Sequence, residues 1–192
     1  MAAAILVRLI FWLWFGAALA AGHFLLLQRI PPPATQGLLL LLAGALLFSY
    51  FAIRPARQWT DACDLRALIL LHLTRFAGVY LLVLHHRGEL PGDFAVPACI
   101  GDICVAAFAL PVAIAPLEEP QRQRAIRIWN VVGSIDILLV VATAIRFNLA
   151  DPAQLRAFTY LPLSLLPTFL VPLMIATHVV IFVRLARAQS SA

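Results

Sequence analysis

The chain has 192 residues, of which 63% are hydrophobic and only 12% are charged. Soluble domains are about half apolar and about a quarter charged, so this composition excludes a water-soluble globular protein and a disordered one. The formal net charge is +5, and all basic residues are arginines, which we attribute to codon bias in a GC-rich bacterial genome. Because lysine is absent, enzymes that need a lysine nucleophile or a lysine-linked retinal are excluded.

Six stretches are long and apolar enough to cross a bilayer, since a transmembrane helix needs about 20 apolar residues. Prolines, which cannot continue a helix, mark nearly every boundary between them. We therefore predict an all-α integral membrane protein, a six-transmembrane-helix bundle that forms a single transmembrane domain over residues 1–192. The predicted helices cover residues 4–27, 37–54, 66–86, 95–116, 126–147 and 158–183.

The first stretch contains Ala18-Leu19-Ala20, which resembles the cleavage site of a signal peptide. The apolar run continues through Leu27, so we interpret this stretch as a membrane helix. An even number of helices places both termini on the same side, and loops rich in arginine stay in the cytoplasm. With both termini cytoplasmic, nine arginines lie inside and four lie outside. We expect a multi-pass protein of the bacterial inner membrane with both termini in the cytoplasm.

Three charged residues fall inside the predicted spans: Arg75 near the middle of the third, Asp102 in the fourth and Asp136 near the middle of the fifth. A charged side chain within a membrane is costly, so it is usually paired or faces a cavity. Counted along the helices, the three residues lie at similar depths, and a guanidinium can bind carboxylates through two donors. We predict an Arg75, Asp102 and Asp136 cluster, either as a binding site or as an ion pair that only holds the helices together.

The third predicted helix carries a polar stripe that ends at an outer loop. His72, Arg75, Val79, Leu82 and His86 advance by three or four residues, so in an α-helix they share one face. The loop after this helix adds His86, Glu89 and Asp93 to the candidate binding residues. We expect that this loop either dips inward as the mouth of a polar path or forms an ordinary turn at Pro91-Gly92.

His72 and His178 lie at equal predicted depths on the third and sixth helices. This arrangement is typical of ligands to a b-type haem or a two-histidine metal site. The alternative is that both rings form hydrogen bonds, for example with Thr177 or Thr74.

Two other features concern helix shape and packing. Pro162, Pro167 and Pro172 recur in the sixth helix and predict kinks, either for packing or to expose carbonyl groups. Gly133 on the fifth helix is expected to let a neighbouring helix approach Asp136.

The main functional hypothesis is that the protein binds or translocates a small solute or protons. Arg75 would hold an anionic group or keep an aspartate ionised, and protonation of Asp102 or Asp136 would loosen the cluster. The alternatives are a haem and quinone redox protein that uses His72 and His178, and a non-catalytic accessory subunit. No motif of soluble-type catalysis is present. The expected partners are the lipid bilayer, a small solute or protons, and further copies or a larger membrane complex, but no nucleic acid.

Overall fold

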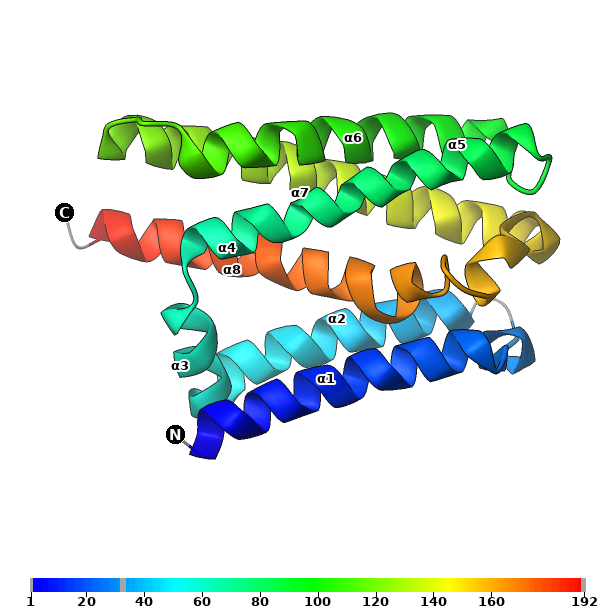
Figure 1. The fold of residues 1–192 in the computed structure, drawn as a ribbon, viewed down its shortest axis with the longest axis horizontal. Coiled ribbons are helices and arrows are strands. Elements are labelled where there is room, and N and C mark those ends of the chain that lie inside the picture. Colours follow the sequence, from blue (N-terminus) through cyan, green and yellow to red (C-terminus); the bar gives the residue numbers. More distant parts are fainter. Residues whose placement is uncertain (1, 32–33, 191–192) are drawn as a thin grey trace. The chain divides into compact units, whose positions relative to one another are not determined.

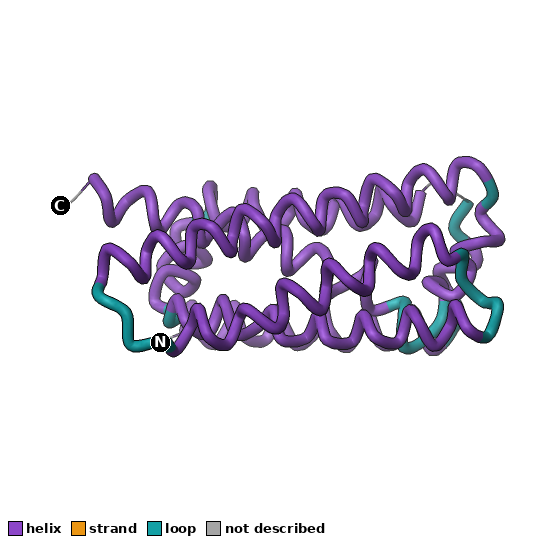
Figure 2. The backbone as a smooth tube through the Cα atoms, turned by 90° about the horizontal axis from the view of Figure 1, so that it is seen from above, coloured by secondary structure: helices purple, strands orange, loops and turns teal. Residues whose placement is uncertain are grey.

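A computed structural model describes residues 2–31 and 34–190, and 88% of the chain is helical with no strand among the described residues. Six helices in this part are long and apolar enough to cross a membrane, which confirms the predicted all-helical class and number of spans. Short loops join most of them (Figure 2). The spans are Ala4–His23, Ala34–Ala52, Leu65–His86, Gly92–Ile114, Glu119–Ala150 and Leu166–Gln189.

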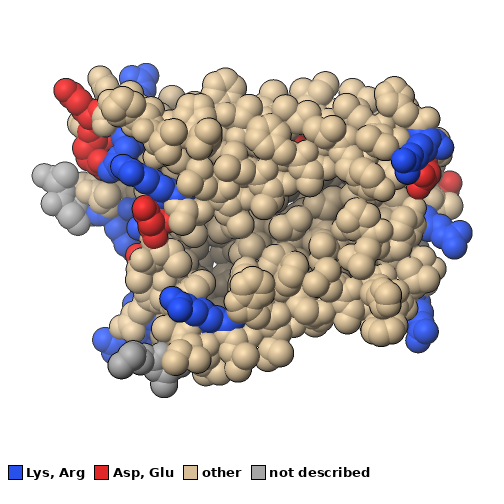
Figure 3. Space-filling view, viewed as in Figure 1, with Lys and Arg blue, Asp and Glu red and all other residues tan. Residues whose placement is uncertain are grey.

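On the face drawn in Figure 3, charged side chains gather near the helix ends, and the surface between them is almost wholly uncharged. Large apolar side chains such as Leu13, Phe108 and Leu139 are more than half exposed. In water, so much exposed apolar surface would be unfavourable, whereas lipid tails solvate it. These features fit a multi-pass membrane protein.

The fifth span begins earlier than the sequence predicted. Helix α7 (Glu119–Ala150) includes two polar turns before the apolar stretch. Glu119 opens it and accepts hydrogen bonds from Arg122 and, at 2.8 Å, from Gln123. Pro120 follows directly, at the start of a helix where a missing N–H group costs nothing. These local contacts extend α7 beyond the apolar segment that marked the predicted span.

The predicted start of the sixth span at residue 158 is wrong. A short 3₁₀ helix, η3 (Pro152–Thr159), is followed by a bend at Tyr160, whose backbone is extended, and by turns over residues 161–164. Pro162 lacks the N–H group that a continuous helix needs here. The span starts with one wide π turn, η4 (Leu166–Leu170), and continues as α8 (Val171–Ser190). Pro162 therefore lies in the turn between η3 and the span, and it does not kink a continuous helix.

The segment after the second span was expected to be a connecting loop, but it forms α3 (Arg54–Ala62). The preceding helix α2 (Ala34–Ala52) ends two residues earlier. Tyr50 on α2 donates a hydrogen bond of 2.9 Å to Asp61 on α3. This bond fixes the polar helix against the end of the apolar one.

The chain forms two compact units, and α7 and α8 each contribute to both. Unit 1 comprises residues 1–62 and 143–176. It contains α1 (Ala2–His23), the short η1 (Leu26–Arg29), α2, α3, η3 and η4. Phe169 packs here against Phe11, Trp14 and Phe15, at ring-centroid distances of 5.3, 4.5 and 5.0 Å. Trp14 also donates a hydrogen bond of 2.9 Å to the carbonyl of Thr168.

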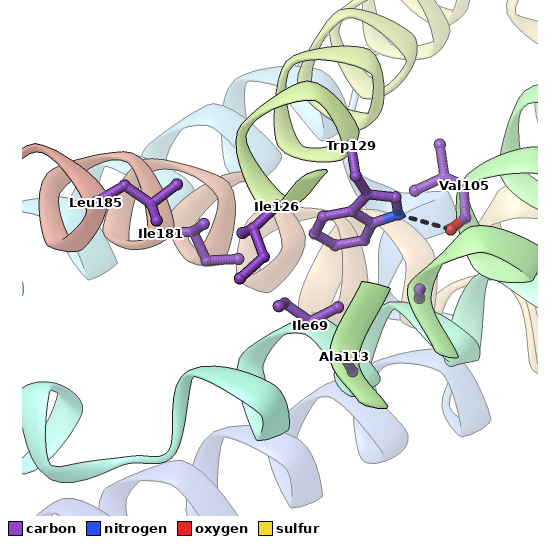
Figure 4. Packing of buried hydrophobic residues seen from close by; sticks show 8 residues of the cluster. Ile69, Val105, Ala113, Ile126, Trp129, Ile181 and Leu185 are labelled. Atoms are coloured by element: carbon purple, nitrogen blue, oxygen red, sulfur yellow. Dashed lines mark hydrogen bonds between the residues drawn. The ribbon is translucent and has the colours of Figure 1, made fainter. Parts of the chain in front are cut away.

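Unit 2 comprises residues 63–142 and 177–192. Its third span consists of α4 (Leu65–Leu70), η2 (Leu71–Gly78) and α5 (Val79–His86). These three segments run beside α6 (Gly92–Ile114), as Figure 1 shows. A buried apolar core joins this span to α6, α7 and α8 (Figure 4). Its members include Ile69, Ile126, Trp129, Ile181 and Leu185. The single transmembrane domain over residues 1–192 stays a prediction.

Candidate functional site

The middle of the third span is a 3₁₀ helix and not an α-helix, and the 3₁₀ period determines which of its residues face inward. The segment η2 is a 3₁₀ helix, which has three residues per turn, so side chains three apart lie directly above one another. The buried residues of η2 are His72, Arg75 and Gly78, and they are spaced three residues apart. A stretch of 3₁₀ helix this long is uncommon inside a span and often marks a functional region.

The predicted α-helical stripe is therefore only partly correct. His72 and Arg75 are buried as expected, but Val79 is 46% exposed and His86 is exposed. The stripe follows the 3₁₀ period through Gly78, because each turn of η2 contains three residues. The polar path along this helix does not continue to its end at His86.

Arg75 binds both aspartates. Its Nε donates to Asp102 Oδ1 at 2.7 Å, and its Nη2 donates to Asp136 Oδ2. Its Nη1 donates to the carbonyl of Gly133 at 3.4 Å. The Arg75 side chain is fully buried, while each aspartate side chain is 17% exposed. The structure thus brings together the three predicted residues from η2, α6 and α7.

Two glycines make the room for these ion pairs. A Cβ atom on Gly78 would lie 2.8 Å from the Cβ and Oδ2 atoms of Asp102. A Cβ atom on Gly101 would lie 1.7 Å from Oδ1 of Asp136. Small residues at helix interfaces let backbones approach closely, as is common in membranes. Neither glycine was singled out in the sequence, although Gly101 directly precedes Asp102.

Gly133 has a different role from the predicted one. A Cβ atom at this position would lie 2.6 Å from Cε1 and 3.0 Å from Nε2 of His178. The glycine therefore makes room for His178, and Gly101 is the residue that accommodates Asp136. The carbonyl of Gly133 accepts a hydrogen bond from Arg75, so Gly133 contacts both the charged cluster and His178.

The two predicted histidines also meet. The rings of His72 and His178 are 4.3 Å apart between centroids and tilted by 43°. His72 is fully buried, and its Nε2 lies 3.1 Å from Thr177 Oγ1. Nδ1 of His178 lies 2.8 Å from Oδ1 of Asn130, a partner that the sequence did not suggest. The predicted hydrogen bond to Thr177 is thus present.

These histidines do not fit a haem. Two imidazoles that bind one iron from opposite sides have ring centroids roughly 6 Å apart, because each nitrogen lies about 2 Å from the metal. The observed 4.3 Å leaves no space for a porphyrin between the rings. Among the described residues, no group of three or more histidine, cysteine or acidic side chains could hold a metal ion.

The residues predicted to form an outer mouth lie away from the cluster. His86, Glu89 and Asp93 are exposed and flank or occupy a short turn between α5 and α6, where Gly88 has a φ of 73°. Asp93 precedes Asp102 by nine residues on one continuous helix, a rise of about 13 Å. The backbone turns over residues 87–90, and Pro91 and Gly92, the position of the alternative predicted turn, lie at the start of α6.

The described residues form a helical protein with six apolar spans. Inside one of its two units, an arginine forms ion pairs with two aspartates. The chain belongs to the family DUF8737, a domain of unknown function, whose family model matches residues 32–186. No curated protein and no solved structure matches the chain.

Proposed function

We propose that this protein spans the bacterial inner membrane with both termini in the cytoplasm and binds or translocates protons at the Arg75, Asp102 and Asp136 cluster. The sequence alone did not decide whether the protein binds a small solute or protons. One observation carries the choice of protons: a fully buried guanidinium is bound by two carboxylates that are each partly accessible.

The charges of the cluster do not cancel when both aspartates are ionised. One guanidinium contributes +1 and two carboxylates contribute −2, which leaves an excess of −1. An uncompensated charge within a membrane is expensive, and closely placed carboxylates resist being ionised together. The arrangement therefore favours one bound proton, shared by Asp102 and Asp136.

An anionic solute is a poorer fit. The Nε, Nη1 and Nη2 atoms of Arg75 already donate to Asp102, to the carbonyl of Gly133 and to Asp136. An anion would have to displace a carboxylate and would add to the negative excess. Of an anion and a proton, the proton is the one that neutralises the cluster.

Proton flux into reconstituted vesicles tests this proposal. Under an imposed membrane potential, we expect the wild-type protein to acidify the vesicle interior faster than protein-free vesicles do. Asp136→Asn leaves one positive and one negative charge, so the flux should fall at least about tenfold.

Glu118→Gln is the matched control, because Glu118 is an exposed carboxylate just before α7. It should retain wild-type flux. Equal flux through folded Asp136→Asn, or wild-type flux no greater than in protein-free vesicles, would contradict proton translocation. It would favour a cluster that only holds the helices together.

A further inference from the structure

The hydrogen bonds of Asn130 determine which nitrogen of His178 carries hydrogen. The Asn130 side-chain Nδ2 donates to the backbone carbonyl of His178 at 3.0 Å. Its Oδ1 atom therefore faces Nδ1 of the ring, at 2.8 Å. An amide oxygen only accepts, so Nδ1 must donate. The other nitrogen, Nε2, then has a bare lone pair when the ring is neutral.

Both histidines keep one buried nitrogen without a hydrogen-bond partner. These atoms are Nε2 of His178 and Nδ1 of His72. Trp129 packs against both rings, at centroid distances of 5.1 Å from His72 and 5.7 Å from His178. It cannot supply the missing donor, because its N–H group is bound to the carbonyl of Val105 at 2.9 Å. A basic nitrogen buried without a donor is a site where a proton can bind.

This histidine pair adjoins the charged cluster. His72 lies one 3₁₀ turn before Arg75, about 6 Å along the axis. Gly133 contacts His178 on one side and accepts from Arg75 with its carbonyl. The charged or titratable groups in the central turns of the packed elements are His72 and Arg75 on η2, Cys99, Asp102 and Cys104 on α6, and Asp136 on α7. The other charged groups of α6 and α7 lie nearer the helix ends, at Asp93, Glu119, Arg122, Arg124, Arg127 and Arg146.

We propose that Nε2 of His178, beside His72, is a second binding site for the proton that neutralises the Arg75, Asp102 and Asp136 cluster. This inference rests on the proposed function. In the transfer, the proton leaves a carboxyl oxygen of Asp102 or Asp136 and binds Nε2. No other bond changes, and the products are a carboxylate and an imidazolium whose charges offset each other.

The apolar core closes the path beyond the histidines. Ile69 lies one turn before His72, Ile126 one turn before Trp129, and Ile181 one turn after His178. All three are at most 3% exposed. A proton on His178 is thus held between the carboxylates and an apolar layer. This position suits a site that holds a proton until the helices rearrange.

Nitrogen NMR of the full-length protein, labelled with ¹⁵N-histidine and ¹³C-aspartate in lipid, tests the inference. In the wild type, the neutral ring of His178 should show a protonated Nδ1 and a bare Nε2. The variant His178→Gln assigns these signals by their loss, and His23→Gln is the control for removing another histidine. A neutral ring with hydrogen on Nε2 would overturn the inference, and this measurement needs no variant in the cluster.

The second measurement tests the charge coupling. In Asp136→Asn, Arg75 balances the one remaining carboxylate, so the cluster holds no proton that it could pass to His178. The fraction of His178 rings that carry hydrogen on both nitrogens should therefore be at least about tenfold smaller than in the wild type at the same pH. Asp102→Asn should act in the same direction, which covers the case in which one variant does not fold. Glu118→Gln should leave this fraction unchanged. An equal fraction in the wild type and in a folded aspartate variant would overturn the inference.

The same samples separate this inference from the proposed function. If no aspartate of the cluster ever shows a protonated carboxyl signal in the wild type, the proposed function fails. If that signal is present while His178 is insensitive to Asp136→Asn, only the second proton site fails.

Discussion

Gly101 on α6 lies against Asp136 on α7 so closely that a Cβ atom on the glycine would come within 1.7 Å of the carboxylate oxygen Oδ1. The absence of one side chain thus allows a charged group from the next helix to reach Arg75. The ion pair and the helix packing depend on the same contact.

The substitution Gly101→Ala should therefore break the cluster. The new methyl group must displace Asp136, which combines overpacking with a partly unpaired buried charge, at a cost of about 3 kcal/mol or more. Thermal unfolding in detergent measures the loss. Gly44→Ala is the matched control, since nothing lies within 4 Å of a Cβ atom there, and it should be neutral or slightly stabilising. Equal stability of the two variants would contradict the close contact.

Substitutions of Arg75 should separate stability from proton binding. Arg75→Gln leaves two partly buried carboxylates without their cation, which should cost about 3 kcal/mol of the unfolding free energy. Arg75→Lys should recover only part of this, because one ammonium cannot reproduce donors that point to two separate carboxylates.

A triple variant, Arg75→Met with Asp102→Leu and Asp136→Leu, removes all three charges together. It should be more stable than Arg75→Gln, because no charge is left buried alone, but it should carry no proton flux. Unfolding and flux are measured on the same preparations. A triple variant that conducts protons like the wild type would contradict the role of the cluster.

The aromatic contacts of unit 1 give a prediction that is independent of the charges. Phe169→Ala removes a ring that packs against Phe11, Trp14 and Phe15, at a cost of about 3–5 kcal/mol. The fluorescence of Trp14 should change with it. Phe108→Ala, at a side chain that is 64% exposed, should have little effect on stability in lipid. Similar losses in both variants would argue against this packing.

The proposed orientation follows from the arginine distribution. A reporter that is active only outside the cytoplasm should be active when fused within residues 87–91, and inactive at either terminus or within residues 117–119. The opposite pattern would reverse the proposed topology and would exchange the two sides of the proton path.

The sequence predicted those features that depend on composition and on the cost of charge in a membrane. Six apolar stretches correspond to six helices, and the meeting of Arg75 with Asp102 and Asp136 follows because an isolated charge is unfavourable there. The roles of Gly78 and Gly101 could not be predicted, since a glycine in a membrane helix carries no information about its neighbour.

The misses have three separate physical origins. An α-helical period was assumed for the third span, but its central turns are 3₁₀, so the inward row passes through Gly78 and leaves Val79 exposed. The pairing of Asn130 with His178 depends on how α7 and α8 pack, which no local pattern encodes. Polarity alone made His86, Glu89 and Asp93 candidates, although a turn at a helix end is polar for ordinary reasons.

Infrared spectroscopy of the protein in lipid tests the central claim, that the cluster holds one proton, most directly. At neutral pH the wild type should show the C=O band of a protonated carboxylic acid, and the band should shift when aspartate is labelled with ¹³C. Either Asp102→Asn or Asp136→Asn alone should abolish it, because one carboxylate then balances Arg75. A wild type without this band, or a band that survives in both variants, would contradict the account.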